Sequence, residues 1–185
     1  MDYVQICWEM VMAIGIVSDR DPQVELPRLD VARFAPANRR RLSAPALRTF
    51  TAIADLWGLN EEQRRLILGY PSRSTYQGWC KQAREHGEIT LDVDVLTRIS
   101  ALLGIHQALG VLFADEHEGV HWLLRPHDAA VFGGHPPINL VTNGTQDGLM
   151  TVRRFLDAAR GGAYMAPNAL DAAFEAYDDS EIVFS

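Results

Sequence analysis

The sequence predicts an all-α protein in which a helical bundle is followed by a smaller helical domain. Apolar residues recur three and four positions apart along most of the chain, which is the spacing of a buried helix face. No segment alternates convincingly with the two-residue period of a β-strand. A length of 185 residues with 48% hydrophobic content is sufficient to bury a core.

The first 36 residues are interpreted as an N-terminal extension and linker. Residues 4–17 are apolar, but they lack a basic flank, contain Glu9 and are too short to span a bilayer. We therefore expect either a packing segment or a poorly ordered extension, and no membrane association. Residues 21–37 contain three prolines and little periodicity, which is typical of a linker. The two cysteines, Cys7 and Cys80, do not form a disulfide framework and favour a reducing cytoplasm.

The first regular helix is expected to begin near Ser43. This serine can cap the N-terminus, and Pro45 is tolerated in the first turn of a helix. Gly58 is expected to end the helix. Between them, apolar residues recur at helical spacing: Leu47, Phe50, Ile53, Ala54 and Trp57.

Two short helices with a tight turn follow. Asn60 opens the first, and Gln63 three residues later resembles a capping box. Gly-Tyr-Pro at 69–71 cannot continue that helix, because proline lacks the amide hydrogen and disfavours α geometry in the residue before it. Ser72 can cap the next helix, over residues 73–85. This arrangement is the signature of a helix-turn-helix.

A polar loop at residues 86–90 leads into the last helices of the bundle. Asp92 is expected to cap a helix that Gly104 breaks, and residues 105–113 then form a separate short helix. The apolar face of the longer helix contains Val95, Ile99, Leu102 and Leu103.

Charge is distributed unevenly along a chain whose formal net charge is −7. Residues 37–86 carry nine basic and four acidic residues, a balance of +5. Residues 1–36 carry three basic and six acidic residues, and residues 87–185 carry five basic and fourteen acidic residues, so both ends are acidic. A basic middle between acidic ends is expected when one segment faces phosphates and another faces a different partner.

The N-terminal part of the helix at residues 73–85 supplies the candidate DNA contacts. In a helix-turn-helix this part of the second helix reaches base edges in the major groove. Arginine suits guanine, glutamine suits adenine, and hydroxyl groups can contact bases or phosphates. Trp79 is expected on the core face of the same helix. The candidate base contacts are Arg73, Ser74, Thr75 and Gln77, with Lys81 as a phosphate contact.

A competing signal is the H-E-x-x-H sequence at residues 117–121. His117 and His121 could bind zinc from one helix face, with Glu118 as general base and His127 at the spacing of a third ligand. However, Leu124 stands where this protease pattern requires glycine, and no strand precedes it to form a cleft. We expect no metal, cofactor or catalytic residue, and we retain a zinc metallopeptidase as the weaker alternative.

Residues 122–162 carry an ordered series of short motifs. They are Trp-Leu at 122 with Pro126, Phe-Gly-Gly at 132, Pro-Pro-Ile-Asn-Leu at 136, Asp-Gly-Leu at 147, and Val-Arg at 152 with Leu156. This series resembles the toxin-binding domain of the Xre/MbcA/ParS antitoxins. Residues 44–113 resemble the Xre-like helix-turn-helix of the same family.

The resemblance implies a division of the chain and a partner. The expected parts are an extension at 1–36, an Xre-like helix-turn-helix DNA-binding domain at 37–115, and a toxin-binding domain with a C-terminal tail at 116–185. The implied partner is a RES-domain toxin, an NAD-consuming enzyme of the ADP-ribosyltransferase-like group. The chain itself would be no enzyme: it would cover the toxin's active site and repress its own operon.

The resemblance also points to candidate toxin contacts. Family members use their C-terminal part to cover the toxin, and here residues 171–179 are acidic and 182–184 are the apolar Ile-Val-Phe. The candidate contacts are Trp122, Arg125, Arg153, Arg154, Arg160, Glu181, Phe184 and Ser185.

A homodimer within a larger toxin–antitoxin complex is expected, because helix-turn-helix repressors usually match two half-sites of an operator. The alternative in the same class is a stand-alone transcription regulator without a toxin. The presence or absence of a neighbouring RES-type gene distinguishes the two.

Overall fold

The structure, a computed structural model, describes residues 35–161, and within this range every regular element is a helix. The prediction of an all-α fold is confirmed. The helices are α2 (Pro36–Leu56), α3 (Glu61–Ile67), α4 (Arg73–Arg84), α5 (Val93–Leu112), α6 (Glu116–Leu124), α7 (Ile138–Val141) and α8 (Gln146–Arg160).

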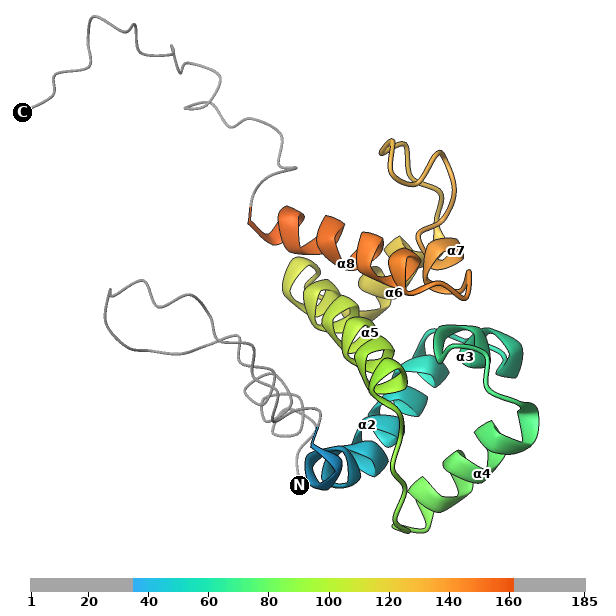
Figure 1. Ribbon diagram of the computed structural model, residues 1–185. Helices are drawn as coiled ribbons and strands as arrows, with labels where there is room; N and C mark the ends of the chain where they lie inside the picture. Colours follow the sequence, from blue (N-terminus) through green and yellow to red (C-terminus); the bar gives the residue numbers. More distant parts are fainter. Residues whose placement is uncertain (1–34, 162–185) are drawn as a thin grey trace, which may run out of the picture.

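Helix α5 is the central element of the fold. It lies between α2 and α8, while α3 and α4 form the edge of the molecule on the far side of α2 (Figure 1). Helix α6 packs against α5, and α7 packs against α8. One continuous core results, in which the largest fully buried side chains include Phe50 of α2, Leu102 of α5 and Leu156 of α8.

Helix α2 begins at Pro36, so the expected start at Ser43 is wrong. Ser43 is fully buried; its hydroxyl donates to the Arg39 carbonyl oxygen at 2.6 Å and accepts from the Leu91 amide at 2.8 Å. The serine therefore connects α2 to the segment before α5 instead of capping a helix. Pro45 lies inside α2, where a proline removes one helical hydrogen bond.

Helix α5 is continuous through Gly104, which corrects the expected break at that residue. A Cβ atom at position 104 would lie 2.8 Å from Nε and Cζ of Arg153. The glycine leaves room for the Arg153 side chain of α8 and does not mark a helix end. Asp92 stands at the N-cap position of α5, but its side chain makes no capping hydrogen bond.

Trp79 packs against the core from α4, as predicted, but it is not the most buried residue of that helix. Tyr76, at 5% exposure, is the buried aromatic residue of this helix, and Trp79 is only partly buried. Burial raises the pKa of the Tyr76 phenol to about 12. The two residues are three apart, so both lie near the same face, and the packing of α4 against α2 selects Tyr76.

Helix α5 is the one described helix that is long and apolar enough to cross a membrane by length and composition. The central helix of a globular core passes the same test. The contacts of α5 with α2, α6 and α8 assign it to the core of this fold.

Candidate DNA-binding and partner-binding surfaces

The turn between α3 and α4 is fixed by a set of side-chain contacts. Gly69 and Tyr70 adopt positive φ angles of 86° and 61°. The Tyr70 hydroxyl donates to Glu62 at 2.7 Å, and this hydrogen bond raises the pKa of Tyr70. The Arg65 guanidinium lies 4.5 Å from the centre of the Tyr70 ring, and its Nε donates to the Pro71 carbonyl oxygen at 2.9 Å. These contacts fix the turn and with it the relative orientation of the two helices.

Both short helices have the caps that the sequence predicts. Asn60 and Gln63 form the capping box, with distances of 2.9 and 3.0 Å, and the Ser72 hydroxyl accepts from the Thr75 amide at 3.1 Å. The C-terminal end of α4 is tied to α2, because Arg48 donates to the Ala83 carbonyl oxygen at 3.0 Å. Helix α4 is therefore held at both ends.

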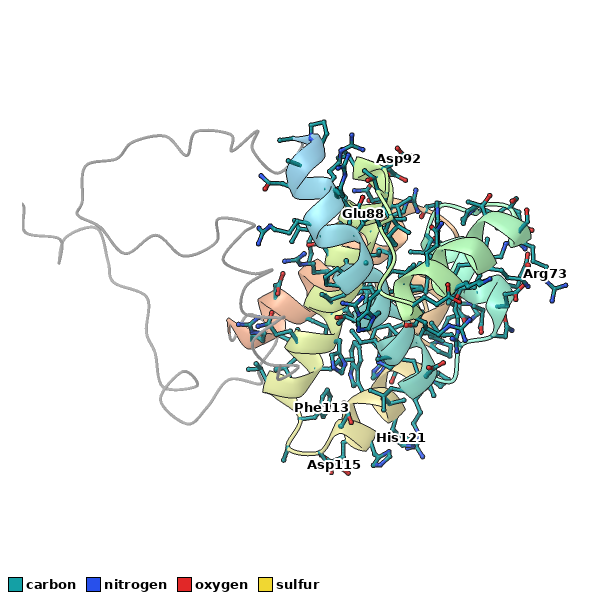
Figure 2. The ribbon with its side chains drawn as sticks, turned by 90° about the horizontal axis from the view of Figure 1, so that it is seen from below. Arg73, Glu88, Asp92, Phe113, Asp115 and His121 are labelled. Carbon is teal, nitrogen blue, oxygen red and sulfur yellow. The ribbon has the colours of Figure 1, made fainter. Side chains whose placement is uncertain are left out.

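The five candidate DNA contacts, Arg73, Ser74, Thr75, Gln77 and Lys81, are all exposed on α4. Arg73 projects from the edge of the molecule in Figure 2, and 72% of its side chain is exposed. Its Nε lies 2.7 Å from Oε1 of Glu61, and Nε2 of Gln77 lies 3.3 Å from Oε2 of the same residue. The geometry therefore presents these side chains to a ligand, and their contact with DNA stays a prediction.

Trp122 lies at the centre of an aromatic cluster in the second half of the described chain. Its ring centroid is 4.6 Å from that of His127, 5.9 Å from Phe132, 6.0 Å from Phe155 and 6.3 Å from Phe113. These rings come from α6, α8, the end of α5 and the loop after α6. The cluster thus joins these segments, and Trp122 is partly buried within it.

The histidines of the H-E-x-x-H sequence do not meet a third ligand in the described part of the chain. His117 and His121 are exposed on α6, and His121 projects outward in Figure 2. Nε2 of His127 lies 2.9 Å from the Trp122 carbonyl oxygen, which can only accept, so this nitrogen donates. Residues 35–161 contain no group of three side chains that could hold a metal ion.

We therefore expect that replacing both His117 and His121 with glutamine leaves partner and DNA binding unchanged. Exposed substitutions away from a packed site change stability by about 0.5 kcal/mol at most. Metal analysis of purified protein provides the check. Stoichiometric zinc in the wild type that the double variant loses would overturn this ranking in favour of the zinc-binding alternative.

The four candidate cations of the partner-binding region differ in their surroundings. The Arg153 side chain is 23% exposed; it crosses Gly104, donates to the Ser100 carbonyl oxygen at 3.5 Å and lies 3.6 Å from Asp157. It connects α8 to α5. Arg125, Arg154 and Arg160 are exposed, so the structure leaves them available to a partner. Glu181, Phe184 and Ser185 lie outside the described residues, as do residues 1–34 of the expected N-terminal extension.

Exposed apolar side chains near the aromatic cluster were not predicted from the sequence. Leu124 and Val131, which neighbour Trp122 and Phe132 in the chain, are 45% and 43% exposed. Val111 at the end of α5 is 62% exposed. Helical periodicity identifies residues that can be buried, but not those left at the surface after packing. Exposed apolar groups beside arginines are typical of protein–protein contact surfaces.

A hollow of about 220 Å³ lies where the end of α2 meets α5 and α6. Its lining includes Trp57, His106 and Glu116. Burial lowers the pKa of His106, and Glu116, whose Oε1 lies 3.9 Å from the ring Nε2, opposes this effect. The ring also lies against Trp57, with the two ring centroids 6.3 Å apart.

Two capped helices, a fixed turn and an exposed, partly basic second helix define a helix-turn-helix protein, which continues into a second helical unit. Comparison with known families agrees with this class. The antitoxin Xre-like helix-turn-helix domain matches residues 36–104, and the antitoxin Xre/MbcA/ParS C-terminal toxin-binding domain matches residues 108–162. The chain belongs to the Xre/MbcA/ParS antitoxin family, as its sequence motifs indicated.

The chain is also similar to a protein of Sinorhizobium fredii (strain NBRC 101917 / NGR234), "Uncharacterized protein y4oB". The two are 36% identical over 116 residues, which cover 63% of this chain and 84% of the relative.

Proposed function

We propose that this protein is the antitoxin of a type II toxin–antitoxin pair that neutralises a RES-domain, NAD-consuming toxin and represses its own operon. The observation that carries the proposal is the succession of the two family matches along one chain. One matched region includes the exposed face of α4, which suits DNA, and the other includes the surface around Trp122, which suits a protein. The protein would act in the cytoplasm, as a homodimer within a larger toxin–antitoxin complex.

The proposed division of labour follows the surfaces described above. Arg73, Ser74, Thr75, Gln77 and Lys81 would contact operator DNA. Trp122, Arg125, Arg154 and Arg160, together with the exposed Leu124 and Val131, would dock the toxin. The region after α8 would cover the toxin's active site, with Glu181 facing basic groups, and Phe184 and Ser185 placed to exclude substrate.

Co-expression with the neighbouring gene tests the pairing. We expect growth inhibition by the neighbouring product alone, relief on co-expression, and co-purification of the two proteins. A chain that binds operator DNA but has no inhibitory neighbour and no co-purifying partner would be a stand-alone regulator, and the antitoxin proposal would be wrong.

Removal of residues 180–185 tests the mechanism of neutralisation. We expect operator binding to survive, and toxin inhibition to fall much more than complex formation, because the docking surface of α6–α8 stays in place. NAD loss caused by the toxin is measured with full-length and truncated chains at saturating concentration. Equal protection by both would show that the domain body alone blocks the toxin.

A further inference from the structure

We propose that Glu61 is a specificity-determining positioning residue, which holds Arg73 and Gln77 in the geometry needed to read bases. The inference rests on the proposed DNA binding and goes beyond it, because Glu61 is on α3 and need not itself touch a base. One carboxylate contacts both side chains: Oε1 lies 2.7 Å from Nε of Arg73, and Oε2 lies 3.3 Å from Nε2 of Gln77.

Glu61 does not contact the atoms of Arg73 and Gln77 that would read bases. Glu61 takes Nε of Arg73, so the terminal Nη1 and Nη2 are left to donate together to O6 and N7 of guanine. Gln77 uses one hydrogen of Nε2, so the second hydrogen and Oε1 are left for N7 and N6 of adenine. Arg73 and Gln77 are four residues apart, so they share one face of α4.

The position of the Glu61 carboxylate is itself fixed by the fold. Glu61 is the first residue of α3, directly after the Asn60 cap, and the turn that Tyr70 and Arg65 hold sets its distance from α4. Arginine and glutamine side chains lose considerable rotamer freedom when they are ordered on binding. A carboxylate that orders both before binding reduces that loss at the operator.

Stability does not explain this arrangement. The Arg73 side chain is 72% exposed and that of Glu61 is 36% exposed, and solvated ion pairs of this kind contribute little to folding. A carboxylate on a DNA-facing surface also repels phosphates, so it weakens binding to every sequence. Glu61 is therefore expected to increase discrimination by ordering the side chains that read the operator, while its charge lowers affinity for every duplex alike.

The test compares the full-length wild type with the Glu61→Ala and Glu61→Gln variants. Fluorescence anisotropy is measured with a duplex from upstream of the protein's own gene and with a scrambled duplex, at several salt concentrations. Glu85→Gln is the matched control, because it removes one exposed carboxylate from the same unit at the far end of α4.

For Glu61→Ala we expect the ratio of operator to scrambled affinity to fall about tenfold, which is within the range for one bidentate base contact. Affinity for the scrambled duplex should rise. Glu61→Ala should reduce the preference for one base over the others at the same operator positions as Arg73→Ala and Gln77→Ala do. In a chain that already carries Arg73→Ala, adding Glu61→Ala should cause no further loss of preference at the position that Arg73 reads. Glu61→Gln, which keeps an acceptor, should lower the ratio less. If the Glu61→Ala variant fails to fold, the Glu61→Gln variant serves as the test.

Two results would overturn the inference. A ratio for Glu61→Ala equal to that of Glu85→Gln would mean that Glu61 acts only as a charge. Flattening at positions unrelated to Arg73 or Gln77 would mean that it acts elsewhere. A wild-type chain without preference for the upstream duplex would instead contradict the proposed operator binding, which separates the failure of the function from the failure of this inference.

Discussion

Replacement of Gly148 with alanine is expected to destabilise the protein by about 1–3 kcal/mol or more, as overpacking of a rigid site does. A Cβ atom there would overlap the Leu140 carbonyl oxygen and lie 2.6 and 2.7 Å from the amide atoms of the Asn143 side chain. Asn143 cannot move freely, because its Oδ1 accepts from the amide and the hydroxyl of Thr145, both at 2.8 Å. The Thr145 hydroxyl in turn caps the Gly148 amide at 3.0 Å. The clash is therefore with backbone and a fixed corner, and urea unfolding measures its cost.

Gly110→Ala provides the matched control. Gly110 also lies in a helix, but a Cβ atom at this position meets nothing within 4 Å. We expect a gain of up to about 1 kcal/mol, since alanine favours helix over glycine. Similar shifts of the unfolding midpoint for both variants would show that the α7–α8 corner relaxes and that Gly148 is not required there.

Arg73→Ala and Lys81→Ala should impair DNA binding in different ways. Loss of a guanidinium that reads guanine costs roughly 1–3 kcal/mol of operator affinity and relaxes specificity at one base pair. Loss of a phosphate contact at Lys81 weakens all sequences alike and reduces the salt dependence by about one ion. Gel shifts over a range of salt concentrations distinguish the two.

The double variant provides the decisive comparison for α4. With both residues replaced, operator affinity should fall by about the sum of the two single losses, because the residues are expected to act on different parts of the DNA. Unchanged operator affinity would remove α4 from the DNA contact surface. Arg154→Ala, which changes an exposed cation outside the helix-turn-helix, controls for total charge.

Local signals in the sequence predicted the helix-turn-helix well, because its determinants are local. The capping box of Asn60 and Gln63, the Gly-Tyr-Pro turn and the Ser72 cap all involve residues within a few positions of each other. Such features depend on backbone geometry and short-range hydrogen bonds, which residue types at fixed spacing determine.

The features that sequence reading missed depend on distant partners. Ser43 resembled a helix start, but it binds the Leu91 amide, 48 residues away. Gly104 resembled a helix end, but it accommodates Arg153 from α8. Long-range packing overrides local propensity at both positions.

The same distinction applies to the candidate sites. The exposure of Arg73 and Gln77 follows from the helical pattern, whereas their shared contact with Glu61 requires the relative placement of two helices. Arg153, expected as a surface cation, packs between helices because a glycine lies opposite. The sequence alone does not distinguish the partly buried Arg153 from the exposed Arg154.

The two family matches meet between residues 104 and 108, within the continuous helix α5. The proposed DNA-binding and partner-binding surfaces are therefore related by helical phase. One residue inserted at this junction would turn one surface relative to the other by about 100° and shift it by about 1.5 Å. An insertion keeps the orientation approximately only when it is close to a whole number of turns, as with seven or eleven residues.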